Sequence, residues 1–305
     1  MKKLILPLLL CVILLFSGCT ARENRVRPPF FKITDPETDG TAYLLGTMHV
    51  GTANTVYPDE IYAALRECST LAVELDLQAL EADQPRLSSA IRILECKNGS
   101  ASVYLGEDYA EIKKFFQEKQ IYNRNLELYI PAMWNSTLST KLAADCGYSS
   151  AYGTDRAMLT YAKKHSMKIV ELESVEQQYQ VNANEPPELQ IYSLKSSIQT
   201  DYEILKDQMK ELYRAWSEND TAALERMLTD EEIPEELSDE YAQYYYEMYE
   251  NRQKNMAEYI AQSLKNGDKV FVAVGAMHCC APPDILDLLD GKFVIEQIKY
   301  DSPLT

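Results

Sequence analysis

The chain contains three histidines, and two of them end closely similar segments, Gly46-Thr47-Met48-His49 and Gly275-Ala276-Met277-His278. Each segment follows a short apolar run that is typical of a β-strand and precedes a region with helical spacing. In α/β proteins, ligands bind in the loops that follow the carboxyl ends of parallel strands, and an imidazole there serves as metal ligand or general base. We therefore expect His49 and His278 to meet in one divided site. The alternative is that each histidine caps a helix or satisfies a hydrogen bond in the core.

Three carboxylates follow other expected elements. Glu74 lies near the end of a predicted strand at 70–76 and Glu173 ends a second strand at 167–173. A carboxylate in such a place can ligate a metal or act as general base. The alternative for Glu74 is that it faces solvent, and for Glu173 that it is an acid at the start of a helix; Glu171 lies on the same strand face as Glu173, so one of the two should face the cleft. Asp155 follows Thr154, which we expect to cap a helix, and an acid there is also favoured by the helix dipole. His165, after two lysines at the end of that helix, is expected to be solvated.

Arg252 and Asn255 interrupt an apolar stripe on an expected helix. An arginine in this position either presents its planar fork to a substrate carboxylate or developing oxyanion, or forms a buried salt bridge. The pair Cys279-Cys280 beside His278 could supply thiolates to zinc, but two adjacent cysteines cannot readily bind one ion, so a disulfide or free thiols are favoured.

The order of predicted elements indicates an α/β fold. A strand at 43–45, a helix at 59–68 and the strand at 70–76 form a βαβ unit, which implies parallel pairing. Further helices are predicted at 107–119, 154–164 and 283–289, and further strands at 269–274 and 292–298. Residues 190–264 are rich in Tyr, Glu, Gln and Met, with few strand formers. We expect one domain over 40–300, with a mixed, largely parallel sheet and a helical insertion at about 188–264.

The amino terminus has the features of a targeting signal. A basic start is followed by an apolar run at 4–16, which is too short to span a bilayer but typical of a signal peptide. Ser17-Gly18-Cys19 resembles a lipobox, so we expect a signal peptide at 1–18, a lipidated Cys19, a tether at 19–39 and an extracytoplasmic, membrane-anchored domain. The alternative is an ordinary cleaved signal peptide. Five further cysteines leave at least one thiol unpaired.

Composition excludes several classes of protein. The 305 residues are 46% hydrophobic and 25% charged, which is typical of a globular protein and not of a disordered one. The net charge of −17 argues against nucleic acid as a partner, because phosphate binding needs a basic face.

The motifs together resemble the TraB/PrgY/GumN family, which includes the Tiki metalloproteases. The resemblance covers roughly residues 40–300 and implies an erythromycin-esterase/ChaN-like core, a divalent-metal site using the two motif histidines and a glutamate, and peptide hydrolysis. The sequence departs from the family after the second histidine, where Cys279-Cys280 replace an apolar residue and glycines. The matching segments are Tyr43 to Gly51, Val73-Glu74-Leu75-Asp76, Tyr152-Gly153-Thr154-Asp155, Val170 to Gln177, Arg252 with Asn255, and Val272 to His278.

These observations lead to one main hypothesis, metal-assisted hydrolysis of a peptide or small protein. His49, His278 and a carboxylate, Glu173 or Glu74, hold a Zn, Mn or Co ion, and the remaining glutamate takes a proton from water. We expect the metal ligand to be Glu173, and Asp155, Arg252 and Asn255 to act with Glu74 in catalysis. The rivals are a surface lipoprotein that binds a peptide or metal without turnover, and an enzyme of esterase type.

Overall fold

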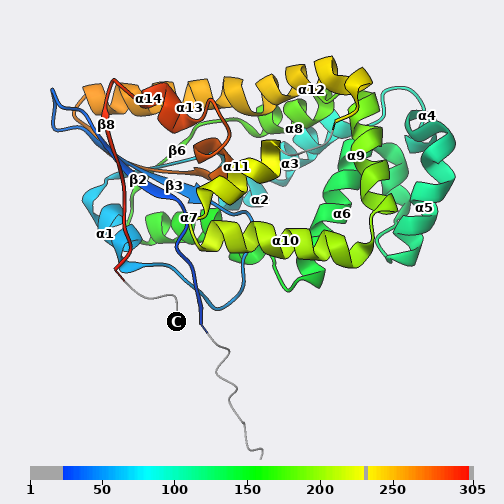
Figure 1. The fold of residues 1–305 in the computed structure, drawn as a ribbon, viewed down its shortest axis with the longest axis horizontal. Helices are drawn as coiled ribbons and strands as arrows, with labels where there is room; N and C mark the ends of the chain where they lie inside the picture. The colour runs from blue at the N-terminus through cyan, green and yellow to red at the C-terminus, as the bar shows by residue number, and fades with distance from the viewer. Residues whose placement is uncertain (1–22, 230–232, 302–305) are drawn as a thin grey trace, which may run out of the picture.

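The computed structural model describes residues 23–229 and 233–301. The expected signal peptide and Cys19 lie outside the described residues. Both ends of the described chain lie on the same side of an elongated molecule (Figure 1).

A six-stranded sheet forms one half of the molecule, with the order β6-β5-β7-β3-β2-β8. β6, β5, β7 and β3 pair in parallel, whereas β2 is antiparallel to both of its neighbours. The expected α/β fold with a largely parallel sheet is therefore confirmed. The strands are β2 (Phe30–Thr34), β3 (Thr41–Thr47), β5 (Thr70–Val73), β6 (Lys168–Glu171), β7 (Lys269–Gly275) and β8 (Val294–Gln297).

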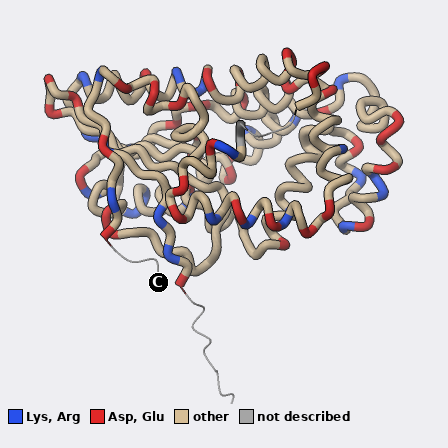
Figure 2. The backbone as a smooth tube through the Cα atoms, in the orientation of Figure 1, with Lys and Arg blue, Asp and Glu red and all other residues tan. Residues whose placement is uncertain are grey.

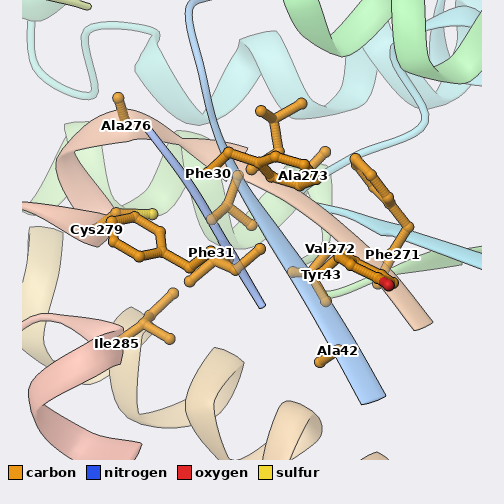
Figure 3. Close-up of a cluster of buried hydrophobic side chains, with 14 of the residues drawn as sticks. Phe30, Phe31, Ala42, Tyr43, Phe271, Val272, Ala273, Ala276, Cys279 and Ile285 are labelled. Atoms are coloured by element: carbon orange, nitrogen blue, oxygen red, sulfur yellow. The ribbon is translucent and has the colours of Figure 1, made fainter. Parts of the chain in front are cut away.

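Helices cover both faces of this sheet. In Figure 1, α13 (Asn251–Lys265) and α14 (Ile285–Leu289) lie on one face, and α1 (Asp59–Glu67) and α7 (Thr154–Lys164) on the other. Because both faces are covered, β3 is buried along its whole length and β7 almost so, which explains their continuous apolar runs. In this core the ring centroid of Phe30 lies 6.1 Å from that of Tyr43 and 5.8 Å from that of Phe271 (Figure 3).

The amino-terminal residues correct one expectation. Residues 30–34 were expected to belong to a tether, but they form β2, a strand of the six-stranded sheet that lies between β3 and the edge strand β8. β1 (Asn24–Arg25) also pairs in parallel with β4 (Thr55–Val56). The physical reason is that Phe30, Phe31 and Ile33 are apolar and buried, so this segment gains more from packing than a solvated linker would.

A helical lobe forms the other half of the molecule and has its own core around Phe116, Trp134 and Leu194. Its helices come from two segments of the chain, one before β6 and one after it, so the expected insertion at 188–264 supplies only part of the lobe. The first segment contains α4 (Ala101–Leu105), α5 (Tyr109–Glu118) and α6 (Pro131–Asp145). The second contains α9 (Pro187–Gln199) and α10 (Tyr202–Ser217).

Further helices connect the lobe to the sheet. They are α2 (Leu77–Ala82), α3 (Gln84–Ile91), α8 (Val175–Asn184), α11 (Thr221–Thr229) and α12 (Ser238–Tyr245). A π-helical turn, η6 (Tyr246–Glu250), joins α12 to α13. Among the described residues, no helix is both long and apolar enough to cross a membrane. Acidic and basic residues are interspersed along the helices (Figure 2).

Candidate active site

Four polar side chains predicted from the sequence follow four parallel strands at the same edge of the sheet. Along the strand order β6-β5-β7-β3, the chain places Glu173, Glu74, His278 and His49 after the respective strand ends. This placement follows from parallel pairing, since the carboxyl ends of parallel strands meet at one edge. The two halves of the site are thereby brought together.

Three of these groups surround Gly275, the last residue of β7. A Cβ atom placed on Gly275 would lie 3.2 Å from Glu74 Oε1, 3.6 Å from His49 Nε2 and 3.9 Å from His278 Cδ2. A larger residue at this position would therefore crowd the site. The glycine leaves the space into which two imidazoles and one carboxylate converge.

His49 is held by Asp155, the second residue of α7. The Nδ1 group of His49 donates a hydrogen bond of 2.9 Å to Asp155 Oδ2, and Thr47 Oγ1 donates one of 2.8 Å to Oδ1. The charge of Asp155 is the main reason that the pKa of His49 is raised to about 9. Asp155 is buried, whereas the side chain of His49 remains 63% exposed, so its Nε2 edge is accessible from the cleft.

The backbone around His49 is fixed by the start of α7. Thr154 N–H donates to Met48 O at 2.9 Å, and a Cβ atom on Gly153 would lie only 2.5 Å from His49 O. We had expected Thr154 to cap the helix, and this expectation is wrong. Gly153 occupies the N-cap position, and no side chain forms a capping hydrogen bond there. The hydroxyl of Thr154 instead accepts from Met48 N–H at 3.3 Å. The close approach of the two chain segments requires glycine at 153.

Glu74 is buried, and both of its carboxylate oxygens are bound. Oε1 accepts from Gly275 N–H at 2.6 Å, and Oε2 accepts from Arg252 Nη2 at 2.9 Å and Gln178 Nε2 at 3.0 Å. Burial by itself raises the pKa of this carboxyl. The neighbouring imidazoles, the guanidinium and the Gly275 N–H outweigh burial and bring the pKa below its ordinary value, to about 2. Glu74 is therefore ionised at neutral pH.

Arg252 lies between two glutamates. Its Nε and Nη2 groups donate to Glu173 Oε1 and Oε2 at 2.5 and 2.8 Å, and Nη2 also donates to Glu74. The Nη1 group donates to the carbonyl of Met248, which belongs to the π-helical turn η6. The structure thus shows the buried salt bridge that was the alternative for Arg252. Glu74 is the glutamate that faces the two histidines, because its Oε1 lies 3.9 Å from His278 Nε2 and shares the space beside Gly275 with His49 Nε2.

Asn255 is not brought to this site. It is exposed and does not line the cleft, while Gln253, Met256 and Ala257 form the buried face of α13. Residues three apart on a helix differ by only about 60° around its axis, but Arg252 is half-buried at the edge of the buried face of α13, so this offset places Asn255 on the solvent side. We therefore withdraw the expected role of Asn255 at the cleft.

His278 is the least solvated group of the site. Its Nε2 lies 3.9 Å from Glu74 Oε1, and the ring makes an edge contact with Tyr249 at 6.1 Å between centroids. Burial lowers the pKa of His278 to about 4, so the imidazole is neutral at neutral pH. Its buried Nδ1 has no hydrogen-bond partner among the described residues. His165, by contrast, is exposed at the end of α7, where it stacks on Tyr161.

Two contributors were missed in the sequence. Gln178 donates to both Glu74 and Glu173 at 3.0 Å, and Tyr249 contacts His278. The neighbouring Gln177 drew attention as part of a motif, but it forms a capping box with Ser174 at the start of α8. The position of Gln178 on α8 could have indicated its role only if it had been known which face of that helix packs toward the cleft.

These groups line a cleft of about 670 Å³ between the sheet edge and helices α8, α10, α11 and η6. Its walls contain apolar side chains, among them Met48, Met248 and Met277. Flexible methionines adapt to apolar groups of different shape. The cleft therefore combines a polar cluster with an adaptable apolar surface.

The residues can be tested for their fit to a divalent metal. Two imidazoles and a carboxylate are suitable in kind, and a histidine that binds a metal usually donates its other N–H to a carboxylate, as His49 does to Asp155. His278 is neutral at neutral pH, which is the form that binds metals, whereas His49, with its raised pKa, has to release the proton on Nε2 when an ion binds. No group of three or more His, Cys, Asp or Glu side chains within residues 23–229 and 233–301 is already arranged to hold an ion. The two imidazoles and the carboxylate are therefore suitable ligands for a divalent metal, but their side chains have to move closer together to bind one ion.

The adjacent cysteines are not part of this donor set. Cys279 packs in the hydrophobic core near Phe31 and Ile285 (Figure 3), and Cys280 is also buried. Burial raises the pKa of Cys280 to about 12 and that of Cys279 well above its ordinary value, so both remain thiols. All five cysteines in the described part of the chain are free.

The fold and the site define a class of α/β protein in which a polar cluster lies at the carboxyl edge of a parallel sheet. The sequence model of the TraB/PrgY/gumN family matches residues 29–295. This match spans most of the chain, which therefore belongs to the TraB/PrgY/gumN family. Comparisons with curated proteins and with solved structures give no match.

Proposed function

We propose that the protein is a metal-dependent hydrolase and that the cleft at the sheet edge is its active site. The single observation that carries this proposal is the convergence of His49 Nε2, His278 and Glu74 Oε1 on Gly275, with His49 anchored through its other nitrogen by Asp155. We assign these three side chains as the ligands of a Zn, Mn or Co ion. When bound, such an ion lowers the pKa of water and polarises the bond to be hydrolysed.

The roles of the two glutamates differ from our expectation in this proposal. Glu74, which was expected to act in catalysis, becomes the carboxylate ligand, because it is the one beside both histidines. Glu173, which was expected to bind the metal, instead holds Arg252. Arg252 and Gln178 in turn fix the orientation of Glu74, and Asp155 fixes the tautomer and orientation of His49.

A peptide is the substrate class that we propose. The volume of the cleft lies within the usual range for ligand-binding pockets. Its methionines suit an apolar side chain next to the bond that is cut. Membership of the family supports this choice through the resemblance to peptide-hydrolysing relatives.

An extracytoplasmic location on a lipid anchor is part of the same proposal. The support is the amino-terminal sequence, with an apolar run followed by Ser17-Gly18-Cys19. Fractionation of cells that produce the full chain tests it. We expect the wild-type protein in the membrane fraction, and we expect a Cys19→Ala variant to be processed differently. Identical behaviour of the two proteins would contradict lipidation.

The activity is tested with the chain from residue 23 onward and a mixture of quenched fluorescent peptides. We expect cleavage that stops when a chelator removes metal and returns when Zn, Mn or Co is added. His49→Ala is expected to stay inactive with every metal, whereas His165→Ala, which alters the third histidine, is expected to remain active. Binding of peptide without cleavage by the metal-loaded wild type would favour the non-catalytic alternative.

A further inference from the structure

A second cavity lies next to the catalytic cleft, between α6, the α8–α9 connection and α12, and has a volume of about 420 Å³. Asn182, near the end of α8, lines both cavities. We propose that this second cavity is a subsite of the same enzyme and binds an uncharged, polar extension of the peptide that is cut at the cleft. This inference rests on the proposed function, because it assigns the second cavity to the part of the peptide substrate that extends beyond the cleft.

The chemistry of the second cavity differs from that of the cleft. Its surface carries side-chain hydroxyls and amides, including those of Asn135, Ser136, Ser139 and Tyr244. It has no lysine or arginine among its described lining residues, and its one charged residue is Glu185. Hydroxyl and amide groups can both donate and accept hydrogen bonds, as main-chain amides and uncharged polar side chains require. An anionic extension is disfavoured by Glu185 and by the absence of a cation.

The wall of this cavity is organised before any ligand binds. Gln190 is buried; its Oε1 accepts from Ala132 N–H at 2.9 Å and its Nε2 donates to Glu185 O at 2.7 Å. Asn135 Nδ2 donates to Gln190 O at 3.2 Å. These bonds join α6 to α9 and leave the exposed side chains of Ser136 and Ser139 on a fixed surface. A fixed surface lowers the entropic cost of binding.

The two cavities are also connected along α12 and η6. Tyr241 lines the second cavity, and its ring is followed by Tyr245 at 6.2 Å and Tyr249 at 4.9 Å between successive centroids. Tyr249 lines the cleft and contacts His278. A row of tyrosines therefore leads from the second cavity to the metal-binding residues. Rigid amphipathic tyrosine side chains provide contact area at low entropic cost.

The experiment compares two mixtures of quenched fluorescent peptides on the metal-loaded protein. Both mixtures have the same randomised residues around the quenched bond, and one is extended at both ends by Ser, Asn and Gly residues. We expect kcat/KM for the extended mixture to exceed that for the short mixture by about tenfold, which corresponds to about 1.4 kcal/mol of binding. An extension built from Asp residues is expected to give no gain.

Ser136→Trp fills the second cavity from an exposed position of α6, and Thr140→Trp is the matched control, because Thr140 is exposed on the same helix and does not line the cavity. The tenfold preference should disappear in Ser136→Trp and persist in Thr140→Trp, with cleavage of the short mixture unchanged in both. A preference that survives Ser136→Trp, or is absent from the wild type, would overturn the subsite.

Failure of the proposed function can be told apart from failure of the subsite. If the metal-loaded wild type cleaves neither mixture, hydrolysis is refuted, and the subsite is then decided by fluorescence polarisation of the extended peptides. Weaker binding to Ser136→Trp than to Thr140→Trp supports the subsite. Equal binding to the two variants refutes it.

Discussion

Asp155 accepts a 2.9 Å hydrogen bond from Nδ1 of His49, and this contact links the start of α7 to the loop after β3. It leaves Nε2 of His49 directed toward the space beside Gly275, where Glu74 and His278 also lie. A carboxylate that is buried and further bound by Thr47 holds the imidazole in one orientation. Carboxylates that accept a hydrogen bond from a metal-binding histidine fix its ring orientation in the same way.

The first prediction concerns Asp155→Asn. The amide keeps the size of the side chain but removes the charge that raises the pKa of His49. We expect metal affinity to fall by about 10- to 100-fold, and NMR titration of the metal-free protein to show a lower pKa for His49. Asp145→Asn is the control, because Asp145 pairs with Lys141 on α6, outside the cleft. Unchanged metal affinity in Asp155→Asn would show that this contact does not support binding.

A second prediction concerns Arg252, whose single charge pairs with both Glu74 and Glu173, each with a side chain only 8% exposed. Arg252→Met leaves Glu74 and Glu173 uncompensated, so we expect the free energy of unfolding to fall by about 3 to 5 kcal/mol in denaturant titrations. Adding Glu173→Gln should restore part of this loss, since one buried charge is then removed. Arg214→Met, which breaks more exposed ion pairs on α10, should cost much less, because solvent screens such pairs. Equal losses in the two arginine variants would contradict the account of the network.

The helical lobe provides a prediction about pH. The carboxylate of Glu127 accepts from Tyr109 Oη at 2.6 Å, Tyr122 Oη at 2.7 Å and Lys113 Nζ at 3.0 Å. Burial raises the pKa of Glu127, but these three donors outweigh it and lower the pKa below the ordinary 4.5. The unfolded chain therefore takes up the proton first, and the stability that this charge contributes is present above pH 4.5 and is lost as pH falls through the lowered value.

Glu127→Gln tests this contribution. We expect it to lower the free energy of unfolding by about 1 to 3 kcal/mol at pH 7, and the difference from wild type to shrink as pH falls below 4.5. Glu118→Gln is the control, because Glu118 forms an exposed pair with Lys114 at 3.8 Å. A difference between Glu127→Gln and wild type that stays constant with pH would contradict the ionised network.

The sheet edge could be predicted from the sequence because parallel pairing converts similar local segments into spatial neighbours. The two apolar runs that end in Gly-x-Met-His, at His49 and His278, were sufficient to expect that β3 and β7 place both histidines at one edge. The choice between Glu74 and Glu173 could not be made in this way. It depends on β5, and not β6, pairing with β7, and only long-range contacts determine that order.

Other features depended on packing that a single sequence does not display. β2 was taken as part of a tether because Pro28-Pro29 precede it. One of its pairing partners, β3, is the next strand in the chain, but the other, β8, lies at the far end of the chain. Asn255 was placed beside Arg252 by helical spacing, but only the packing of α13 against the sheet shows which face is buried. The helical lobe was likewise underestimated, since its core joins helices on both sides of β6.

The central claim is that His49, His278 and Glu74 form one metal site, and the most direct measurement is calorimetric titration of Zn, Mn or Co into chelator-treated protein. The account predicts that wild type and His165→Ala bind one ion per chain, and that His49→Ala, His278→Ala and Glu74→Gln each lose this binding while remaining folded by circular dichroism. Retention of full metal affinity when either His49 or His278 is replaced, or no binding by the wild type, would contradict it.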